Sequence, residues 1–455
     1  EITGLTLMAA GGISVESRLG VDANNRAGAY AETGSVGGTS LSLVNASVNE
    51  AYANESAQSV ASVTGGKITA GGMMSIVSNI FSQAKANAKN AKSIGLASFG
   101  GLYAKATAAD DSSAYAENAE IRAASADIRA NADTKAEATS DQPGGASLVS
   151  GSSGTMDAFV GTSTRAQKVS ASAGENARII TEGKISIIAR NVASAKTAMN
   201  KGTEVAGVTI SRNNLVTNAY MDTRVNVGAN AMLRTTKTGA PVELKASDKF
   251  TTHQEASSNT IAVGSSEQPK AQNNVNQTVV LEIAGTIEAM GDVKAEASSD
   301  ADVSAYVNVD AKGIFNANRV EAYNYLRRTV RAAVKSGGSV VSRFGNVDIA
   351  AYSGRNDSIV ARTEGGQIGA IGISKGYSRS QLIARVSVEI ERGAVVDGTH
   401  GNVTIASYGG SRLISAETDF SGGGLSSSSD VHSEVFFGTD GEASNSEVKI
   451  GVSGS

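Results

Sequence analysis

The pattern that decides the fold is clearest in residues 291–297, which read Gly-Asp-Val-Lys-Ala-Glu-Ala. From Val293 onward, aliphatic or small side chains alternate with charged ones. Successive side chains of a β-strand point to opposite faces, so this alternation predicts a strand with one buried and one wet face. A helix would instead need apolar residues three and four positions apart, which the stretch lacks.

The same pattern recurs along the whole chain, most closely in residues 183–189, 345–351 and 401–407. We take the first large aliphatic residue of each copy as its anchor, and successive anchors are about 51 to 69 residues apart, as in a repeat architecture. Such regular intervals indicate about eight repeats, each of which buries its apolar face by stacking on the next. The anchors are Leu5, Met74, Ile128, Ile185, Val242, Val293, Val347 and Val403.

Two further segments accompany most anchors. A short aliphatic segment precedes the anchor, as at Ile68 and Ile287, and a glycine-rich aliphatic segment follows it, as in residues 94–96 and 261–264. Several strands in fixed order suit a chain that coils, so residues 1–455 are predicted to form one all-β, rod-shaped solenoid segment of a longer chain. We expect two broad or three narrow turns per repeat, and two would give a rod on the order of 80 Å at ~4.8 Å per turn.

Composition supports a thin core and excludes several classes of protein. Hydrophobic residues make up 40% of the chain, aromatic residues only 4%, and tryptophan is absent. The net charge of -4 argues against disorder along the whole chain and against nucleic acid as a partner, because phosphate binding needs a strong basic surplus. The chain has no cysteine and no apolar run approaching the ~20 residues of a membrane-spanning segment.

A search for catalytic chemistry finds no constellation. The three histidines are isolated in sequence, and Ser82-Gln83-Ala84-Lys85 matches a serine–lysine pattern without its companion elements. The position after each anchor carries no recurrent carboxylate, which argues against a β-helical polysaccharide-degrading enzyme. We therefore predict no catalytic residues, no cofactor, no metal ligands and no enzymatic activity.

One stretch stands out as a candidate binding surface. Between residues 320 and 335, apolar residues alternate with an aromatic and basic set, in a chain poor in aromatic residues. If the stretch is a strand, its outer face is suited to a glycan, an anionic polymer or a receptor. A helix with solvated charges is the alternative. The candidate residues are Tyr323, Tyr325, Arg327, Arg331 and Lys335.

The doubled element Gly-x-Ile-x-x-x-Gly-x-Val-x-Ile-x-Ala resembles the shaft repeats of two-partner secreted (type V) exoproteins of the filamentous haemagglutinin group. Residues 66–78, 285–297 and 339–351 carry it best, and the long spacing looks most like the leukotoxin-type branch. The resemblance implies a right-handed parallel β-helix in an exoprotein that is secreted through an outer-membrane partner and lies outside a bacterium or on its surface.

The resemblance also implies the function that we expect. The leading hypothesis is a structural shaft that mediates adhesion, through a host-cell receptor or a glycan. The alternatives are a segment of a leukotoxin-type cytotoxin and, third, a β-helical polysaccharide-degrading enzyme. Lateral self-association of the shafts is left open by the sequence.

Overall fold

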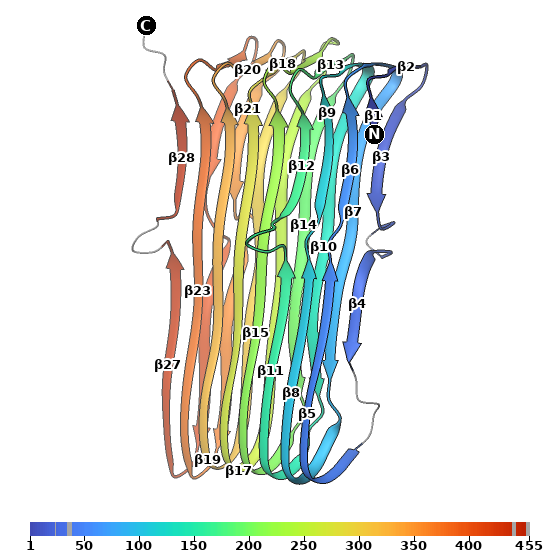
Figure 1. The fold of residues 1–455 in the computed structure, drawn as a ribbon. Helices are drawn as coiled ribbons and strands as arrows, with labels where there is room; N and C mark the ends of the chain where they lie inside the picture. Colours follow the sequence, from blue (N-terminus) through green and yellow to red (C-terminus); the bar gives the residue numbers. More distant parts are fainter. Residues whose placement is uncertain (23, 34–38, 439–442, 452–455) are drawn as a thin grey trace.

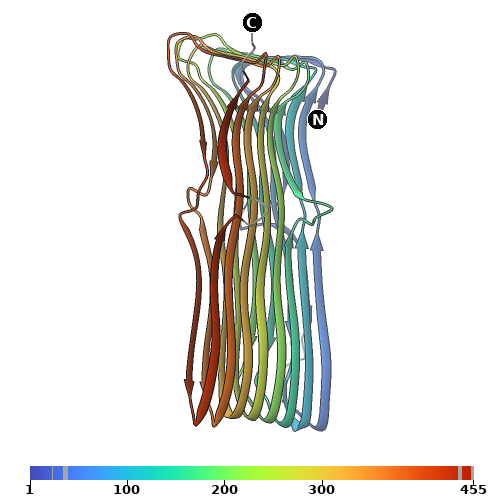
Figure 2. The same ribbon diagram turned by 90° about the vertical axis from the view of Figure 1, so that its left-hand side faces the viewer.

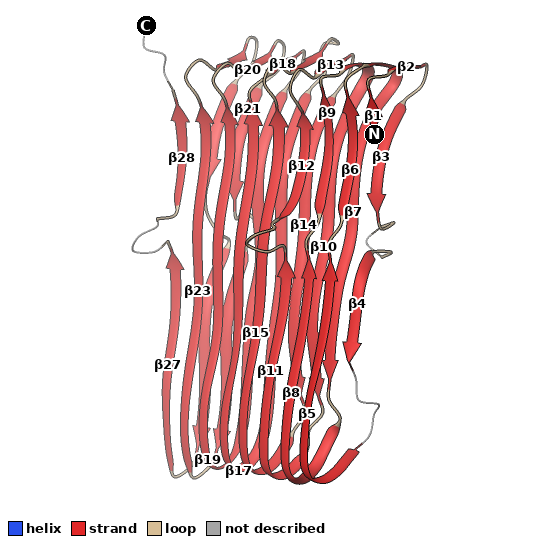
Figure 3. Ribbon diagram, in the orientation of Figure 1, coloured by secondary structure: helices blue, strands red, loops and turns tan. Residues whose placement is uncertain are grey.

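The computed structural model describes residues 1–22, 24–33, 39–438 and 443–451 (Figure 1). In these ranges strands predominate and no helix occurs (Figure 3). Strand pairings are parallel and join each segment to the equivalent segment about one repeat later, as Ile185 pairs with Val242 and Val242 with Val293. The chain is therefore an all-β parallel solenoid, as the alternation predicts.

The strands follow in chain order as β1 (Ile2–Thr3), β2 (Thr6–Ala9), β3 (Ile13–Leu19), β4 (Ala27–Thr33), β5 (Thr39–Glu55), β6 (Gln58–Thr64), β7 (Lys67–Lys89), β8 (Lys92–Ala108), β9 (Asp111–Glu117), β10 (Glu120–Gln142), β11 (Ala146–Val160), β12 (Gln167–Ala173), β13 (Arg178–Thr181), β14 (Ile185–Lys201), β15 (Glu204–Val227), β16 (Met232–Thr235), β17 (Val242–Ile283), β18 (Thr286–Ala289), β19 (Val293–Val334), β20 (Ser339–Ser342), β21 (Val347–Ser353), β22 (Ser358–Ile368), β23 (Ile371–Ile390), β24 (Val395–Gly398), β25 (Val403–Tyr408), β26 (Leu413–Gly423), β27 (Ser426–Phe437) and β28 (Asn445–Ile450).

Each turn of the coil has a descending wall, a bend, an ascending wall and a short strand. In β17 the 42-residue strand runs down one wall from Val242, rounds the bend near Gly264 and rises along the other wall to Ile283. The short strand β18 then leads into the next turn. In Figure 1 the nearer strands run upward, the fainter ones run downward, and successive turns advance from right to left, so the coil is right-handed. Figure 2 shows the tight bend at the base and the short strands at the opposite, wider end.

Each repeat forms one wide turn, so the expectation of two or three narrower turns is wrong. One wall, such as the 20-residue β23, spans roughly 66 Å at ~3.3 Å per residue, whereas eight stacked turns span roughly 40 Å at ~4.8 Å each. The molecule is thus longest along its strands, and the description as a rod elongated along the stacking axis, with the length estimated for that rod, is also wrong. The cause is that long strands continue through the bend and use a whole repeat for one circuit.

Two of the eight predicted anchors are out of register. Ile13, not Leu5, pairs with Met74, and Leu5 is 57% exposed in the turn after β1. Ala126, not Ile128, pairs with both Met74 and Ile185, and a register irregularity between Ala123 and Ser125 precedes it. With these corrections the spacing becomes more even, and equivalent positions are about 51 to 61 residues apart.

The interior is divided along the walls into two apolar clusters. The cluster next to the short strands contains large aliphatic side chains such as Ile187 and Leu244, whereas alanine is common in the cluster nearer the bend, as at Ala84 and Ala104. Inward positions between and beside them carry buried polar side chains, including Asn191 and Asp248. The thin, small-residue core expected from composition is therefore present, but polar layers interrupt it.

Glycines allow adjacent turns to approach closely at the bend. A Cβ atom added to Gly313 would lie 1.7 Å from the carbonyl oxygen of Ala262 in the preceding turn. A Cβ atom added to Gly264 would have no atom within 4 Å. A side chain is therefore excluded at one bend glycine and tolerated at the other.

These two glycines give a matched test of the bend. Gly313→Ala should lower the denaturant midpoint strongly, because two backbone segments must separate to admit the methyl group. Gly264→Ala should leave the midpoint within error or raise it slightly, since alanine restricts the unfolded chain. Equal midpoints for the two variants in urea unfolding followed by circular dichroism would contradict this account of the bend.

Candidate functional site: a groove on the ascending wall

Residues 320–334 lie in the ascending part of β19 and Lys335 follows the strand directly, so the stretch is a strand and not a helix. Val320, Ala322 and Leu326 point into the core, while the candidate side chains alternate with them on the outer side. The alternation that singled out this stretch is confirmed. The structure nevertheless divides the five candidate residues into two groups with different surroundings.

The two basic side chains at the C-terminal end of this stretch are neutralised by carboxylates of neighbouring turns. The Arg331 Nε lies 2.9 Å from Glu389 Oε2, and its Nη1 lies 3.2 Å from Glu282 Oε1. The Lys335 Nζ lies 2.8 Å from Glu391 Oε1 and 3.5 Å from Glu282 Oε1. These two cations therefore bridge β17, β19 and the end of β23, which disfavours an anionic ligand at this end.

The aromatic end is a stacked tyrosine pair flanked by cations. The rings of Tyr323 and Tyr325 have centroids 6.1 Å apart and are inclined by 15°. Lys270 Nζ lies 5.2 Å from the centre of the Tyr323 ring, and Arg379 Cζ lies 5.9 Å from that of Tyr325. Burial raises the pKa of Tyr323 to about 12, and burial also raises the pKa of Tyr325. Both hydroxyl groups therefore stay protonated near neutral pH and can donate hydrogen bonds.

An open groove of 580 Å³ lies beside Tyr325 and crosses four successive turns. The parallel register places Tyr220, Asn276 and Arg327 opposite one another in consecutive turns, so each turn contributes to the same groove. Its polar and aromatic side chains are Asn218 and Tyr220 from β15, Asn274 and Asn276 from β17, Tyr325 and Arg327 from β19, and Gln381 from β23.

A short ladder of amide side chains leads from Gln272, beside this groove, to Asn274 and Asn218 within it. The Asn274 Nδ2 donates to Asn218 Oδ1 at 2.9 Å, and the Gln272 Nε2 donates to Asn274 Oδ1 at 2.9 Å. Each amide has two donor hydrogens and an acceptor oxygen, so the ladder orients the groups without using all of their hydrogen-bonding capacity. The groove thus presents oriented neutral donors and acceptors beside tyrosine rings.

Sequence reasoning found Tyr325 and Arg327 but missed the members from the other turns. Tyr220 and Gln381 join the site only through the pairing register, and the variable length of the repeats hides that register. A signal was present in the sequence, because equivalent outer positions of successive repeats carry Asn218, Asn274, Tyr325 and Gln381. Aligning the repeats on the ascending wall, rather than on the anchors, would have revealed it.

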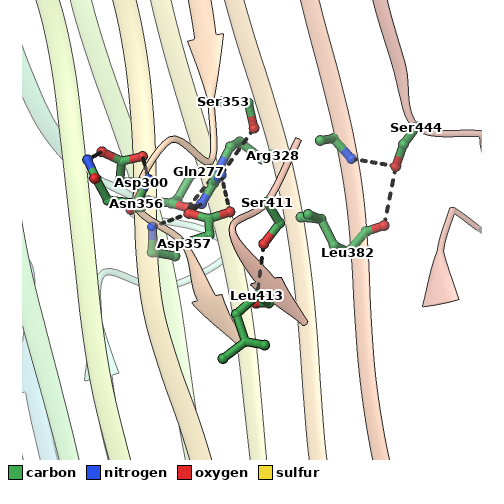
Figure 4. A network of polar contacts seen from close by, with 12 residues as sticks. Gln277, Asp300, Arg328, Ser353, Asn356, Asp357, Leu382, Ser411, Leu413 and Ser444 are labelled. Carbon is green, nitrogen blue, oxygen red and sulfur yellow. Dashed lines mark hydrogen bonds and ion pairs between the residues drawn. The ribbon is translucent and has the colours of Figure 1, made fainter. Parts of the chain in front are cut away.

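A fully buried ion pair lies in the core, on the inner side of the same stretch of β19 (Figure 4). Arg328 follows Arg327 in sequence but points inward, and its Nη1 lies 2.8 Å from Asp357 Oδ2. The same guanidinium donates to Gln277 Oε1 at 3.1 Å and to Ser353 Oγ at 3.1 Å. Asp357 Oδ1 accepts the backbone N–H of Ala301 at 2.7 Å. The pair therefore links the ascending wall to the segment between β21 and β22.

Asp248 belongs to the same buried layer. Its Oδ1 accepts the Gln277 Nε2 at 3.2 Å, and burial raises the pKa of Asp248 to about 7. The pKa in the unfolded chain is near the ordinary value of 3.8, so the folded state binds more protons between these values. The stabilising contribution of protonated Asp248 is present at acid pH and is lost as the pH rises through about 7.

We therefore expect Asp248→Asn to flatten the pH dependence of stability. Asparagine keeps the shape and cannot ionise, so the variant should gain melting temperature relative to the parent as the pH rises from about 5 to about 8. Differential scanning calorimetry at several pH values checks this, with Asp302→Asn on the outer side of β19 as the control. A constant difference across the range would show that Asp248 does not titrate there.

Among the residues that the structure describes, no group of three His, Asp or Glu side chains is arranged to hold a metal ion. Within those same ranges, no helix is long and apolar enough to cross a membrane. Comparison of the chain with known protein families, with curated proteins and with solved structures found no match.

Proposed function

We propose that this chain is a non-enzymatic, structural segment of a large bacterial exoprotein and that its ascending wall adheres to a glycan. The observation that carries the proposal is the groove beside Tyr325, where aromatic rings and oriented amides lie together on a stiff wall. Sugars present hydroxyl groups at their edges and C–H groups on their faces. Amides and tyrosines supply hydrogen bonds for the first and apolar contact for the second.

The scaffold supports this use. Inner turns pair with a neighbour on both sides, so β17 is held by β15 along one edge and by β19 along the other. Sites built on strands hold their side chains more precisely than sites on loops. A wall of parallel strands therefore keeps the groove open and prearranged, which reduces the entropy lost on binding.

The charges favour a neutral oligosaccharide over an anionic polymer. Arg331 and Lys335 face three carboxylates, and Arg379 lies 4.4 Å from the centre of the Phe436 ring. The groove crosses three inter-turn spacings, roughly 14 Å at ~4.8 Å each, which suits a chain of sugar rings better than a single ring. The family resemblance adds an outer-membrane secretion partner and a position outside the bacterial cell to the proposal.

The proposal is tested by measuring the binding of the purified chain to a neutral-oligosaccharide array and to host cells. Tyr325→Ala and Tyr220→Ala should each weaken binding at least tenfold, because each removes a ring that lines the groove. Tyr30→Ala, on the descending wall, is the matched control and should bind as the parent does. Unchanged binding by the two groove variants, with intact circular dichroism, would overturn the proposed adhesion site.

A further inference from the structure

The outer edge of the bend carries a row of exposed aliphatic side chains, which we call the apical ridge. At the apex of the bend, the pairing between neighbouring turns skips one position. The aliphatic side chains at that position are 48% to 93% exposed. Exposed apolar neighbours such as Val149, Ile261 and Phe315 widen the row in several turns. The apex members of the apical ridge are Leu43, Leu96, Leu148, Val263, Ile314 and Leu425.

The geometry of the bend forces these side chains outward. Ser42 pairs with Gly95 and Val44 with Ala97, so Leu43 and Leu96 fall between paired positions. The same interruption recurs at Leu148 and at Val263. Single exposed leucines are common on proteins, whereas an apolar row through most turns marks an interaction surface. These side chains do not contribute to the apolar core, since they belong to neither of its two clusters.

Charge differs on the two sides of the apical ridge. On the ascending side, the nearby outer positions hold four cations, Arg212, Lys270, Arg319 and Lys375, with three carboxylates, Glu50, Glu321 and Asp430. Arg319 contacts Glu321 and Lys375 contacts Asp430, yet the side chains of the two cations remain 60% and 50% exposed.

The descending side is acidic by comparison. There the nearby outer positions hold four carboxylates, Asp141, Asp310, Glu364 and Asp419, with three cations, Lys89, Lys92 and Lys312. Because the two sides differ in sign, a negatively charged surface would draw the ascending side toward itself.

We propose that the apical ridge docks on a lipid bilayer with anionic headgroups, with its aliphatic side chains in the interfacial region. A convex edge of exposed leucine, isoleucine and valine can enter the headgroup region, while cations above it reach the phosphates. Basic residues near an anionic surface add electrostatic attraction that salt screens. A bilayer is fluid and can enclose both sides of a convex edge, whereas a second copy would meet it only along a line.

This inference is independent of the proposed groove beside Tyr325, because none of the ridge residues or the cations near them lines that groove and the ligand is a lipid. A glycan-binding failure would leave it intact, and a lipid-binding failure would leave the groove intact. The two surfaces lie at different heights on the ascending wall, so both can be occupied in one orientation of the molecule.

The absence of tryptophan makes a single-probe experiment possible. Leu148→Trp places one indole on the apical ridge, and Phe344→Trp places one at the opposite end of the walls, where the native ring is 54% exposed. With vesicles of phosphatidylcholine and phosphatidylserine, the Leu148→Trp emission should shift to the blue and be quenched by acyl-chain-brominated lipid. Emission of Phe344→Trp should not change.

Flotation with the same vesicles tests the native side chains. Leu96→Ser combined with Ile314→Ser should reduce the floating fraction at least tenfold, while Phe344→Ser combined with Val395→Ser, which changes similarly exposed residues elsewhere, should not. Arg212→Gln with Lys375→Gln should weaken binding and reduce its salt dependence.

Three outcomes would overturn the proposal. The first is an unchanged Leu148→Trp emission with vesicles present. The second is equal binding to phosphatidylcholine alone, which removes the role of anionic headgroups. The third is a blue shift without vesicles that follows protein concentration and accompanies a dimer in sedimentation, which would assign the apical ridge to a second copy.

Discussion

The structure depends on one constraint, the parallel in-register pairing of each turn with the next. Val242, Val293, Val347 and Val403 lie in one column because each pairs with its equivalent one repeat later. Pairing satisfies backbone donors and acceptors along both walls, so the coil can be wide without a thick core. Each column must then hold side chains that tolerate close stacking at ~4.8 Å, which explains why small and β-branched residues recur.

The same constraint decides how polar groups are buried. A polar residue that faces inward can use its equivalent in the next turn as a partner, as Asn273 Nδ2 donates to Asn324 Oδ1 at 2.8 Å. Arg328 has no charged equivalent in its column, where Gln277 and Ala384 are its neighbours, so it reaches across the core to Asp357. Such a buried pair is costly to form and more costly to break, since removing one partner leaves a buried charge. It restricts the register of the turns that it joins.

The alternation of side chains was sufficient to predict the strands, the parallel stacking and the outward direction of Tyr323 and Tyr325. It was insufficient to predict the number of turns, because one strand continues through the bend of β17, where the alternation only shifts by one residue at Val263 and Gly264. Segments 142–156 and 267–276 are rich in Pro, Gly and polar residues, which commonly mark loops, yet they lie largely in β11 and β17. Pro269 is accommodated because pairing with β19 pauses between Glu267 and Lys270. The groove was only partly predicted, since its members meet through register and not through sequence proximity.

Side chains that face solvent also form columns from turn to turn, but core packing does not restrict which residues occupy these outer columns. The composition of the outer columns therefore carries more information about function than the composition of the core does. The core columns are explained by stacking alone, and any protein of this architecture would need them. An outer column has no such requirement, so the amides and tyrosines of the groove and the aliphatic apex of the bend need another cause. In a coil, one residue type at one repeat position becomes a line of side chains across the surface. A short repeat can in this way build an extended binding surface without any loop or insertion.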